Sequence, residues 1–283
     1  MNILTKSTEL VIQYIQALQV ATNLIQKEKL PICSRVICAA HQALFSSNNG
    51  DNASPGIYRK QTVKVGNLVP PMAQRIPELM SDLEKYINND TSLPALIQAG
   101  LVHLQFETIH PFLDGNGRIG RLLIVAMMID SKLLDDPILY ISYYFKKHHA
   151  QYYQTLENVR TQGDFEGWII YFLQAVRDSA SDAYKRIEDI RALEEKMKQE
   201  IINDSQFLKH QETVLAIVTF LFSSPITTIT HISDAIGKSY NTTQALCLKL
   251  IDAGIMSETI QTKNKRYKQY RLNAYLNLLE KEY

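Results

Sequence analysis

The chain has 283 residues, of which 46% are hydrophobic and 21% are charged. This balance excludes collagen-like, low-complexity and disordered chains, and the length predicts about two domains of roughly 150 residues each. Thirty basic against twenty-nine acidic residues leave a formal net charge of +1, so the composition indicates no overall attraction to nucleic acid or to a membrane surface.

Cysteine use and hydropathy indicate a protein of a reducing compartment. The three cysteines form no CxxC pair, which favours reduced thiols. The uncharged stretch 213–233 is strongly apolar only over 214–222, whereas a membrane-spanning helix needs roughly 20 apolar residues. The N-terminus carries Lys6 and Glu9 where a signal peptide requires an apolar core. We therefore expect a cytoplasmic protein.

Apolar residues at three- and four-residue spacing predict helices along most of the first 205 residues. The predicted helices cover residues 9–27, 31–46, 74–88, 93–108, 116–134, 146–160 and 165–203. One insertion interrupts this pattern at about 57–69. Its alternating side chains and the turn residues Gly66 and Asn67 predict a short β-hairpin, which we call the flap.

The composition changes near residue 205, where we place a domain boundary. Residues 183–205 have a single apolar stripe among charges, which predicts an exposed connector helix. Predicted helices over 214–222, 230–236 and 242–253 are followed by alternating residues over 255–272. This order resembles a winged helix-turn-helix.

The second domain is the basic part of the chain. Segment 207–283 has nine Lys/Arg against six Asp/Glu, a net charge of +3, and 263–271 has five basic residues and no acidic one. A basic wing after a helix-turn-helix is typical of a DNA reader, with Gln244 and Lys249 as candidate contacts. A protein-docking module, or a wing that is simply solvated, remains the alternative.

One segment, HPFLDGNGRIGR over residues 110–121, concentrates the groups that phosphate chemistry needs. Pro111 disfavours helix at the residue before it, and the apolar run 122–128 begins a new helix. A glycine-rich turn that leads into a helix N-terminus presents unpaired N–H groups and the positive end of the helix dipole. Such a turn binds anions.

Four side chains of this segment add chemistry to the turn. Arg118 and Arg121 are three residues apart, so both can fork around phosphate oxygens. Asp114 offers a hard oxygen ligand for Mg²⁺, which typically takes one or two carboxylates together with substrate phosphates. His110 has an ordinary pKa near 6.5 and can act as a general base. The segment therefore predicts phosphoryl or nucleotidyl transfer from a Mg-nucleotide.

The same segment resembles the signature of the Fic/Doc family, HxFx(D/E)GNGRxxR. The similarity runs from about residue 10 to 200, through GIYR at 56–59, FETI at 106–109, LYIS at 139–142 and the tyrosine pair at 152–153. It implies an all-α Fic fold with a short β-hairpin flap over residues 1–205. The small winged helix-turn-helix domain (α+β) expected over 206–283 follows from the element order described above and lies outside this similarity. The similarity also implies protein adenylyltransferase activity, in which AMP passes from ATP to a Ser, Thr or Tyr hydroxyl of a target protein.

The resemblance assigns roles by position in the motif. His110 would deprotonate the target hydroxyl, and Asp114 would hold Mg²⁺. Gly117 favours nucleotidyl transfer, because Doc-type kinases have Lys at this place. Tyr152 would either line the adenine pocket or be a core aromatic. The expected ATP- and phosphate-binding residues are Gly115, Asn116, Gly117, Arg118, Ile119, Gly120 and Arg121, and the expected target-docking residues of the flap are Val63, Lys64, Val65 and Gly66.

Many family members carry an inhibitory helix with the pattern (S/T)xxxE(G/N). The sequence contains no intact copy: Glu157 and Glu166 are followed by Asn or Gly, but Tyr153 and Gln162 stand four residues before them. Two explanations remain open, an N-terminally shortened form and an inhibitory partner chain. Both predict a de-repressed enzyme that modifies itself.

Two rival functions remain. One is a DNA-binding regulator whose Fic domain senses nucleotide without turnover. The presence of both His110 and Asp114 argues against this function, because a pure sensor does not need a general base. The other is removal of AMP from modified proteins, which in relatives uses the inhibitory glutamate. The sequence also leaves open a homodimer, the target protein and the preferred nucleotide.

Overall fold

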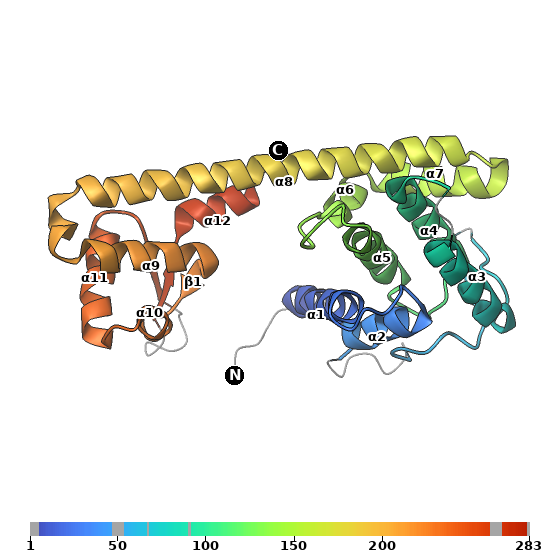
Figure 1. The fold of residues 1–283 in the computed structure, drawn as a ribbon, viewed down its shortest axis with the longest axis horizontal. Helices are drawn as coiled ribbons and strands as arrows, with labels where there is room; N and C mark the ends of the chain where they lie inside the picture. The colour runs from blue at the N-terminus through green and yellow to red at the C-terminus, as the bar shows by residue number, and fades with distance from the viewer. Residues whose placement is uncertain (1–5, 47–53, 67, 90–91, 261–267, 282–283) are drawn as a thin grey trace. The chain divides into compact units, whose positions relative to one another are not determined.

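The computed structural model describes residues 6–46, 54–66, 68–89, 92–260 and 268–281. It is mostly helical, which confirms the predicted fold class at this level (Figure 1). The first elements are α1 (Lys6–Gln26), α2 (Ser34–Leu44), the 3-10 helix η1 (Ala73–Arg75), α3 (Ile76–Asn89), α4 (Ala95–Ile109), α5 (Asn116–Asp130), α6 (Ile141–Lys147), α7 (His149–Gln162) and α8 (Phe165–Asn203).

The chain divides into two compact units, Met1–Ala180 and Ser181–Tyr283. This division falls within α8, and Met197 and Ile201 of this helix are buried in the core of the second unit. The end of the predicted connector helix is therefore part of a core. Where the functional domains separate stays a prediction.

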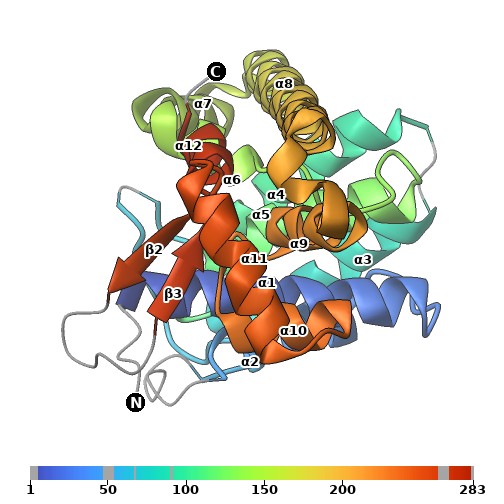
Figure 2. The same ribbon diagram turned by 90° about the vertical axis from the view of Figure 1, so that its left-hand side faces the viewer.

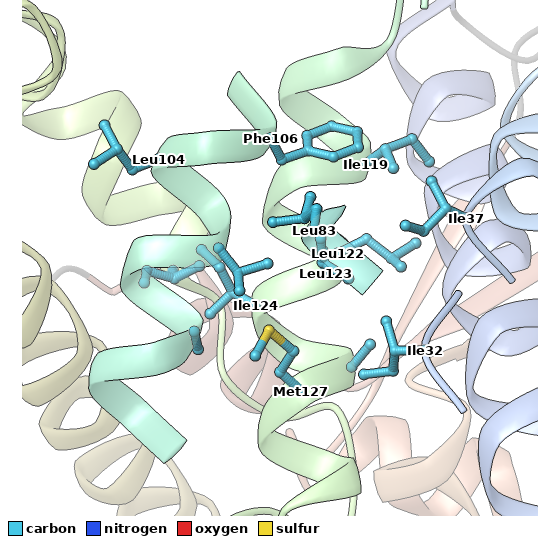
Figure 3. Packing of buried hydrophobic residues seen from close by; sticks show 14 of the residues in the cluster. Ile32, Ile37, Leu83, Leu104, Phe106, Ile119, Leu122, Leu123, Ile124 and Met127 are labelled. Carbon is cyan, nitrogen blue, oxygen red and sulfur yellow. The ribbon is translucent and has the colours of Figure 1, made fainter. Parts of the chain in front are cut away.

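The core of the first unit surrounds α5. This helix packs against α1, α2 and α4, and α3 packs against α2 and α4. Figure 3 shows Leu122, Leu123 and Met127 of α5 between Ile32 and Ile37 on one side and α4 on the other. Helix α5 is buried on most of its faces, so the neighbouring helices hold its first turn in place. The second half of the motif, residues 116–121, forms this first part of α5.

Two predicted boundaries differ from the structure. Residues 146–160 were expected as one helix, whereas α6 and α7 are separated at His148, whose backbone is not helical (φ −107°, ψ 37°). The predicted flap contains one antiparallel bridge, in which Val65 and Leu68 exchange both backbone hydrogen bonds at 3.0 Å around Gly66. Its turn residue Asn67 lies outside the described residues, and a longer hairpin stays a prediction.

The second unit combines helices with a small sheet. Its elements after α8 are the 3-10 helix η2 (Ser205–His210), α9 (Gln211–Ser223), β1 (Ile226–Thr227), α10 (Ile229–Ile236), α11 (Tyr240–Asp252), β2 (Ser257–Ile260), β3 (Lys268–Arg271) and α12 (Asn273–Glu280). The antiparallel sheet has the order β1-β3-β2, and Figure 2 shows β2 and β3 as neighbouring arrows.

Local capping explains the turn between α10 and α11. Gly237 ends α10 in the left-handed region, and the Ser239 hydroxyl accepts a hydrogen bond from Thr242 N–H at the start of α11. Most of the predicted basic wing, including its tip at 263–265, lies outside the described residues. The assignment as a winged helix stays a prediction. Within the described ranges, no helix combines the length and apolar character that crossing a membrane requires.

Candidate active site

The motif residues form a loop between two buried helices. Helix α4 ends at Ile109, and His110 takes a left-handed conformation (φ 50°, ψ 60°) while its N–H bonds to Phe106 O at 2.9 Å. Helix α5 then begins at Asn116. We call His110–Gly115 the motif loop. Its left-handed start turns the chain out of α4 and brings His110 to the end of α5 where backbone N–H groups are free of helical partners.

Asn116 holds the motif loop closed on itself. Its side-chain oxygen accepts a hydrogen bond from Phe112 N–H at 2.9 Å, and its amide nitrogen donates to Phe112 O at 2.8 Å. The side chain is buried, so both its polar atoms are used within the protein. For a bound phosphate, Asn116 can therefore offer its backbone N–H and not its side chain.

Gly115 is required by both conformation and space. Its φ is +80°, which other residues adopt only with strain, and an added Cβ would lie 2.9 Å from the Phe45 ring. Its N–H donates to the Asp114 carboxylate at 2.6 Å. This donor is satisfied locally, so the free donors of the first turn begin with residues 116–118 of α5.

The two motif arginines follow this turn on α5 and have different partners. The Arg118 guanidinium stacks over the Phe45 ring at 5.0 Å and lies 3.7 Å from the Asp114 carboxylate. Arg121 Nε donates to the Ser142 hydroxyl at 3.1 Å. One buried nitrogen of Arg118, Nη1, has no hydrogen-bond partner among the described residues. Such a nitrogen is the group that an incoming anion would satisfy.

Two other predicted phosphate-binding residues, Ile119 and Gly120, are packed against the protein interior. The Ile119 side chain is fully buried in the core, and its N–H donates to Gly115 O at 3.0 Å. Gly120 faces α4, where an added Cβ would lie 2.6 Å from the Glu107 carboxylate and 3.1 Å from His103 Nδ1. Ile119 therefore offers no free donor in this structure, and Gly120 allows close packing of α5 on α4.

His110 has the properties of a neutral base. Its side chain is only 15% exposed, and burial, together with the charges of Arg59 and Arg160, lowers its pKa below the ordinary value against a smaller opposing effect of the Glu107 carbonyl. Nδ1 has no hydrogen-bond partner among the described residues and lies 4.0 Å from the Glu107 carboxylate. At neutral pH the imidazole is therefore unprotonated and can accept a proton.

Buried ionisable groups lie directly behind the motif, and sequence reasoning missed them. Burial raises the pKa of Glu107 to about 7, although Arg121 and Arg160 act in the opposite direction. Burial likewise lowers the pKa of His103 to about 3. Glu107 Oε1 and His103 Nδ1 lack hydrogen-bond partners among the described residues. Glu107 belongs to the quoted FETI segment, so a signal was present, but nothing in the sequence showed its burial beside Arg121.

Tyr152 closes this cluster from α7. Its hydroxyl lies 2.9 Å from His103 Nε2, and its ring is buried among Phe145 and Trp168. This position matches the alternative of a core aromatic. The role of Tyr152 in an adenine pocket stays a prediction.

His41 of α2 ties the motif loop to the flap, and it too was missed. Its Nδ1 accepts a hydrogen bond from Gly56 N–H at 2.8 Å, so Nε2 carries the proton and donates to Asp114 O at 3.0 Å. The ring stacks on Phe112 with centroids 3.7 Å apart. Because both nitrogens are used, His41 fixes the peptide that carries the candidate metal ligand.

Arg59 makes a second connection between flap and motif loop. Its buried guanidinium donates to the carbonyl oxygens of His110 (2.8 Å), Gln61 (2.9 Å), Pro71 (2.7 Å) and Ile109 (3.3 Å). Its own N–H donates to Pro111 O at 2.9 Å. A cation at the carbonyl end of α4 is favourable in the helix dipole, and here it also fixes the His110 turn.

The predicted flap residues follow Arg59. Lys64 and Gly66 are exposed, while Val63 and Val65 are half-buried. For Thr62, Val63 and Lys64, the described residues provide no backbone hydrogen-bond partner. Within the described residues this stretch therefore has an unpaired backbone edge, which follows Arg59 and its contacts to the motif loop in the chain.

Asp114 fits the requirements of a magnesium ligand. Its side chain is 68% exposed, with Oδ1 bonded to Gly115 N–H. Among the described residues, no cluster of three or more His, Cys, Asp or Glu side chains could hold a metal by itself. A single exposed carboxylate beside an anion-binding turn matches a Mg²⁺ ion held jointly with substrate phosphates.

Comparison with known proteins identifies the domain. The family model described as Fic/DOC family matches residues 31–128. A probable protein adenylyltransferase of Aquifex aeolicus is 33% identical over 88 residues, which are 30% of this chain and 27% of that protein. The protein adenylyltransferase Fic of Drosophila grimshawi is 30% identical over 178 residues, 62% of this chain and 33% of that protein. The chain thus spans about a third of the length of these relatives.

Solved structures share the fold. A Fic family protein from Desulfovibrio desulfuricans superposes with a TM-score of 0.51 at 22% identity, over 95% of this chain and 88% of that chain. Residues 134–508 of Fic-1 from Caenorhabditis elegans give a TM-score of 0.54 at 24% identity, over 66% of this chain and 55% of that chain. These structures show a shared fold, and the match to the Fic/DOC family model assigns residues 31–128 to a Fic/DOC family domain.

Proposed function

We propose that this chain is a protein adenylyltransferase that transfers AMP from ATP to a Ser, Thr or Tyr hydroxyl of a target protein. One observation carries the proposal: a neutral His110 is held by a left-handed turn in the loop that leads into the open N-terminus of α5, and Arg118 and Arg121 belong to the first turns of that helix. The names of the Aquifex and Drosophila relatives support the same reaction class.

The geometry divides the reaction among few groups. His110 takes the proton of the acceptor hydroxyl, whose oxygen attacks the α-phosphorus of ATP. The bond from that phosphorus to the bridging oxygen breaks, and pyrophosphate leaves with the electron pair. The N–H groups at the start of α5 and the two arginines stabilise the negative charge of the phosphates.

Mg²⁺ would be held by Asp114 together with phosphate oxygens, and it would neutralise phosphate charge when bound. Two hydrogen bonds orient Asp114. His41 fixes the Asp114 carbonyl, and Gly115 N–H fixes one carboxylate oxygen. The other carboxylate oxygen faces Arg118 at 3.7 Å.

The flap would position the acceptor. Its open backbone edge at Thr62–Lys64 can pair with an extended segment of the target in the manner of an added β-strand. Arg59 connects this edge to the His110 carbonyl, so a paired segment would lie at a fixed distance from the base.

Transfer of label from ATP tests the proposal. Incubation with labelled ATP and Mg²⁺ should label this protein itself or proteins of a cell lysate, and His110→Ala should reduce the rate of labelling by about 10²- to 10⁴-fold. Equal labelling by both variants would contradict the proposal. Release of AMP from pre-modified protein by the unaltered chain would instead favour the de-AMPylase alternative. Duplex DNA binding without any His110-dependent transfer would favour the regulator.

A further inference from the structure

A pocket of about 440 Å³ lies between α2, the start of the flap and the segment around η1. Its walls are mainly apolar, and its lining includes Cys38, Ile57, Tyr58, Lys60, Ala73 and Pro77. Ile57 is 54% exposed, and Met72, next to Ala73, is 72% exposed. Large apolar side chains that remain exposed around a pocket mark a surface for a ligand or a partner.

The pocket is joined rigidly to the motif loop. The Tyr58 ring packs on Phe112 with centroids 5.3 Å apart, and its hydroxyl donates to the Ser34 hydroxyl at 2.6 Å. Ser34 in turn donates to Glu84 through both its N–H and its hydroxyl. The next residue, Arg59, bonds to the carbonyls of Pro111 and His110. A side chain held in this pocket would therefore have a fixed position relative to His110.

The segment that forms the flap side of the pocket is basic, and the nearby carboxylates of Glu78 and Glu84 are engaged with Arg75 and Ser34. Residues 54–77 contain four basic side chains and no acidic one: Arg59, Lys60, Lys64 and Arg75. Arg59 is committed to backbone carbonyls, and the exposed Arg75 lies 3.5 Å from Glu78. Lys60 and Lys64 are exposed as well, and no ion pair is described for either of them. Lys60 lines the pocket itself, and Lys64 belongs to the open edge of the flap.

We propose that this pocket, the acceptor pocket, selects the target: it receives a bulky apolar side chain of an extended target segment whose neighbouring residues are acidic. The proposal rests on the proposed function for its role in transfer. Burial of an aliphatic or aromatic side chain against the apolar walls would stabilise binding, and Lys60 and Lys64 would attract carboxylates on the same segment. A basic segment in the same place would be repelled.

Synthetic peptides test the acceptor pocket by direct binding. A set with a central Ser, Thr or Tyr carries flanks of Glu and Gly, of Lys and Gly, or of Ser and Gly. Each peptide is made with and without Leu at every flanking position. Binding is measured by fluorescence anisotropy, which needs no catalysis, and the same peptides are then offered as acceptors with labelled ATP.

We expect acidic peptides with Leu at one register to bind about tenfold more tightly than basic or Leu-free ones. Lys60→Glu together with Lys64→Glu should reverse the charge preference. Ala73→Phe, which fills the pocket, should remove the Leu preference and keep the charge preference. Lys238→Glu, an exposed lysine of the second unit, is the matched control and should change neither.

The outcomes separate this inference from the proposed function. His110-dependent transfer with equal or undetectable binding of acidic and basic peptides overturns the acceptor pocket and leaves AMP transfer standing. Selective peptide binding without His110-dependent label overturns AMP transfer and supports the pocket as a peptide site. A sedimentation coefficient that falls in the Lys60→Glu variant would assign the pocket to a second copy of this chain and overturn the inference.

Discussion

The two compact units bury different kinds of polar side chain. In the first unit, the fully or nearly buried groups include the ionisable side chains of His41, Arg59, His103 and Glu107. In the second unit, the buried polar groups of the described residues are the hydroxyls of Thr227, Ser233 and Thr243. Burying an ionisable group costs more folding free energy than burying a neutral hydroxyl, because the charged form loses far more hydration.

The buried ionisable groups of the first unit gather around the motif loop, the site of the proposed transfer. All four ionisable groups lie within one or two contacts of the motif loop: His41 and Arg59 bind its carbonyls, while Glu107 and His103 pack behind Gly120. The buried side chains of the second unit are mainly apolar among the described residues. Substitutions at matched positions in the two units should therefore have unequal effects.

The largest effect is expected at His110. Removal of a general base costs typically 10²- to 10⁴-fold in rate, so His110→Ala should reduce transfer of AMP by about that factor. His210→Ala, an exposed histidine of the second unit, should leave transfer unchanged. Initial rates with labelled ATP compare the two. A similar loss in both variants would mean that the two units do not differ as described.

Two described arginines that bind backbone carbonyls, one in each unit, offer the next comparison. Arg59→Met would leave the carbonyls of His110, Gln61 and Pro71 without their donor, which we expect to cost on the order of 3 kcal/mol of unfolding free energy and most of the transfer activity. Arg186→Met also loses carbonyl contacts, to Leu278 and Leu279, but its side chain is 22% exposed. Water can replace these bonds.

Unfolding in urea measures both variants. Trp168, the only tryptophan, is buried in the first unit and reports on Arg59→Met by fluorescence, while circular dichroism follows Arg186→Met. We expect a change below about 1 kcal/mol for Arg186→Met, with transfer intact. Equal destabilisation by the two changes would show that burial of Arg59 is not the cause of its importance.

Glu107 should make stability depend on pH. Because its pKa is about 7 in the folded protein and near 4.5 when exposed, ionisation of the buried carboxyl destabilises the fold progressively between about pH 4.5 and 7. Glu107→Gln removes this cost, so the variant should be more stable above pH 7 by about 3 kcal/mol and no more stable near pH 4. Urea unfolding at several pH values would show a pH-independent difference if the account of Glu107 is wrong.

A smaller effect concerns the pH profile of transfer. Since burial lowers the pKa of His110, the neutral base persists below pH 6.5, and kcat/KM should begin to fall only below that value. The measurement is kcat/KM for ATP from pH 5 to 8. An acid limb centred above pH 6.5 would show that His110 is not the neutral base that its surroundings indicate.

The motif was readable from the sequence because its parts are consecutive. Pro111 and the glycines determine a turn between two helices, and local rules are sufficient for that. The apolar pattern likewise predicted most helices, since α5 and its neighbours bury whole faces. These features depend on residues close together in the chain.

The contacts that hold the motif loop in place could not be predicted from the sequence, because they join residues far apart in the chain. His41 bonds to Asp114, 73 positions away, and Arg59 bonds to His110, 51 positions away. Nothing in CAAHQAL distinguishes a histidine that fixes a loop from an ordinary core residue. Helix α12 and strand β1 were not predicted from the sequence for a related reason. Each is short, and its position depends on contacts with the rest of the second unit.

The position of the label in ATP tests the central claim most directly. Transfer is measured once with ATP labelled on the α-phosphate and once with ATP labelled on the γ-phosphate, with His110→Ala beside each. The account predicts that the α-label remains on protein, that the γ-label is released in pyrophosphate, and that the variant shows neither event. A γ-label on protein would mean phosphoryl transfer and would contradict the proposed use of the site around His110.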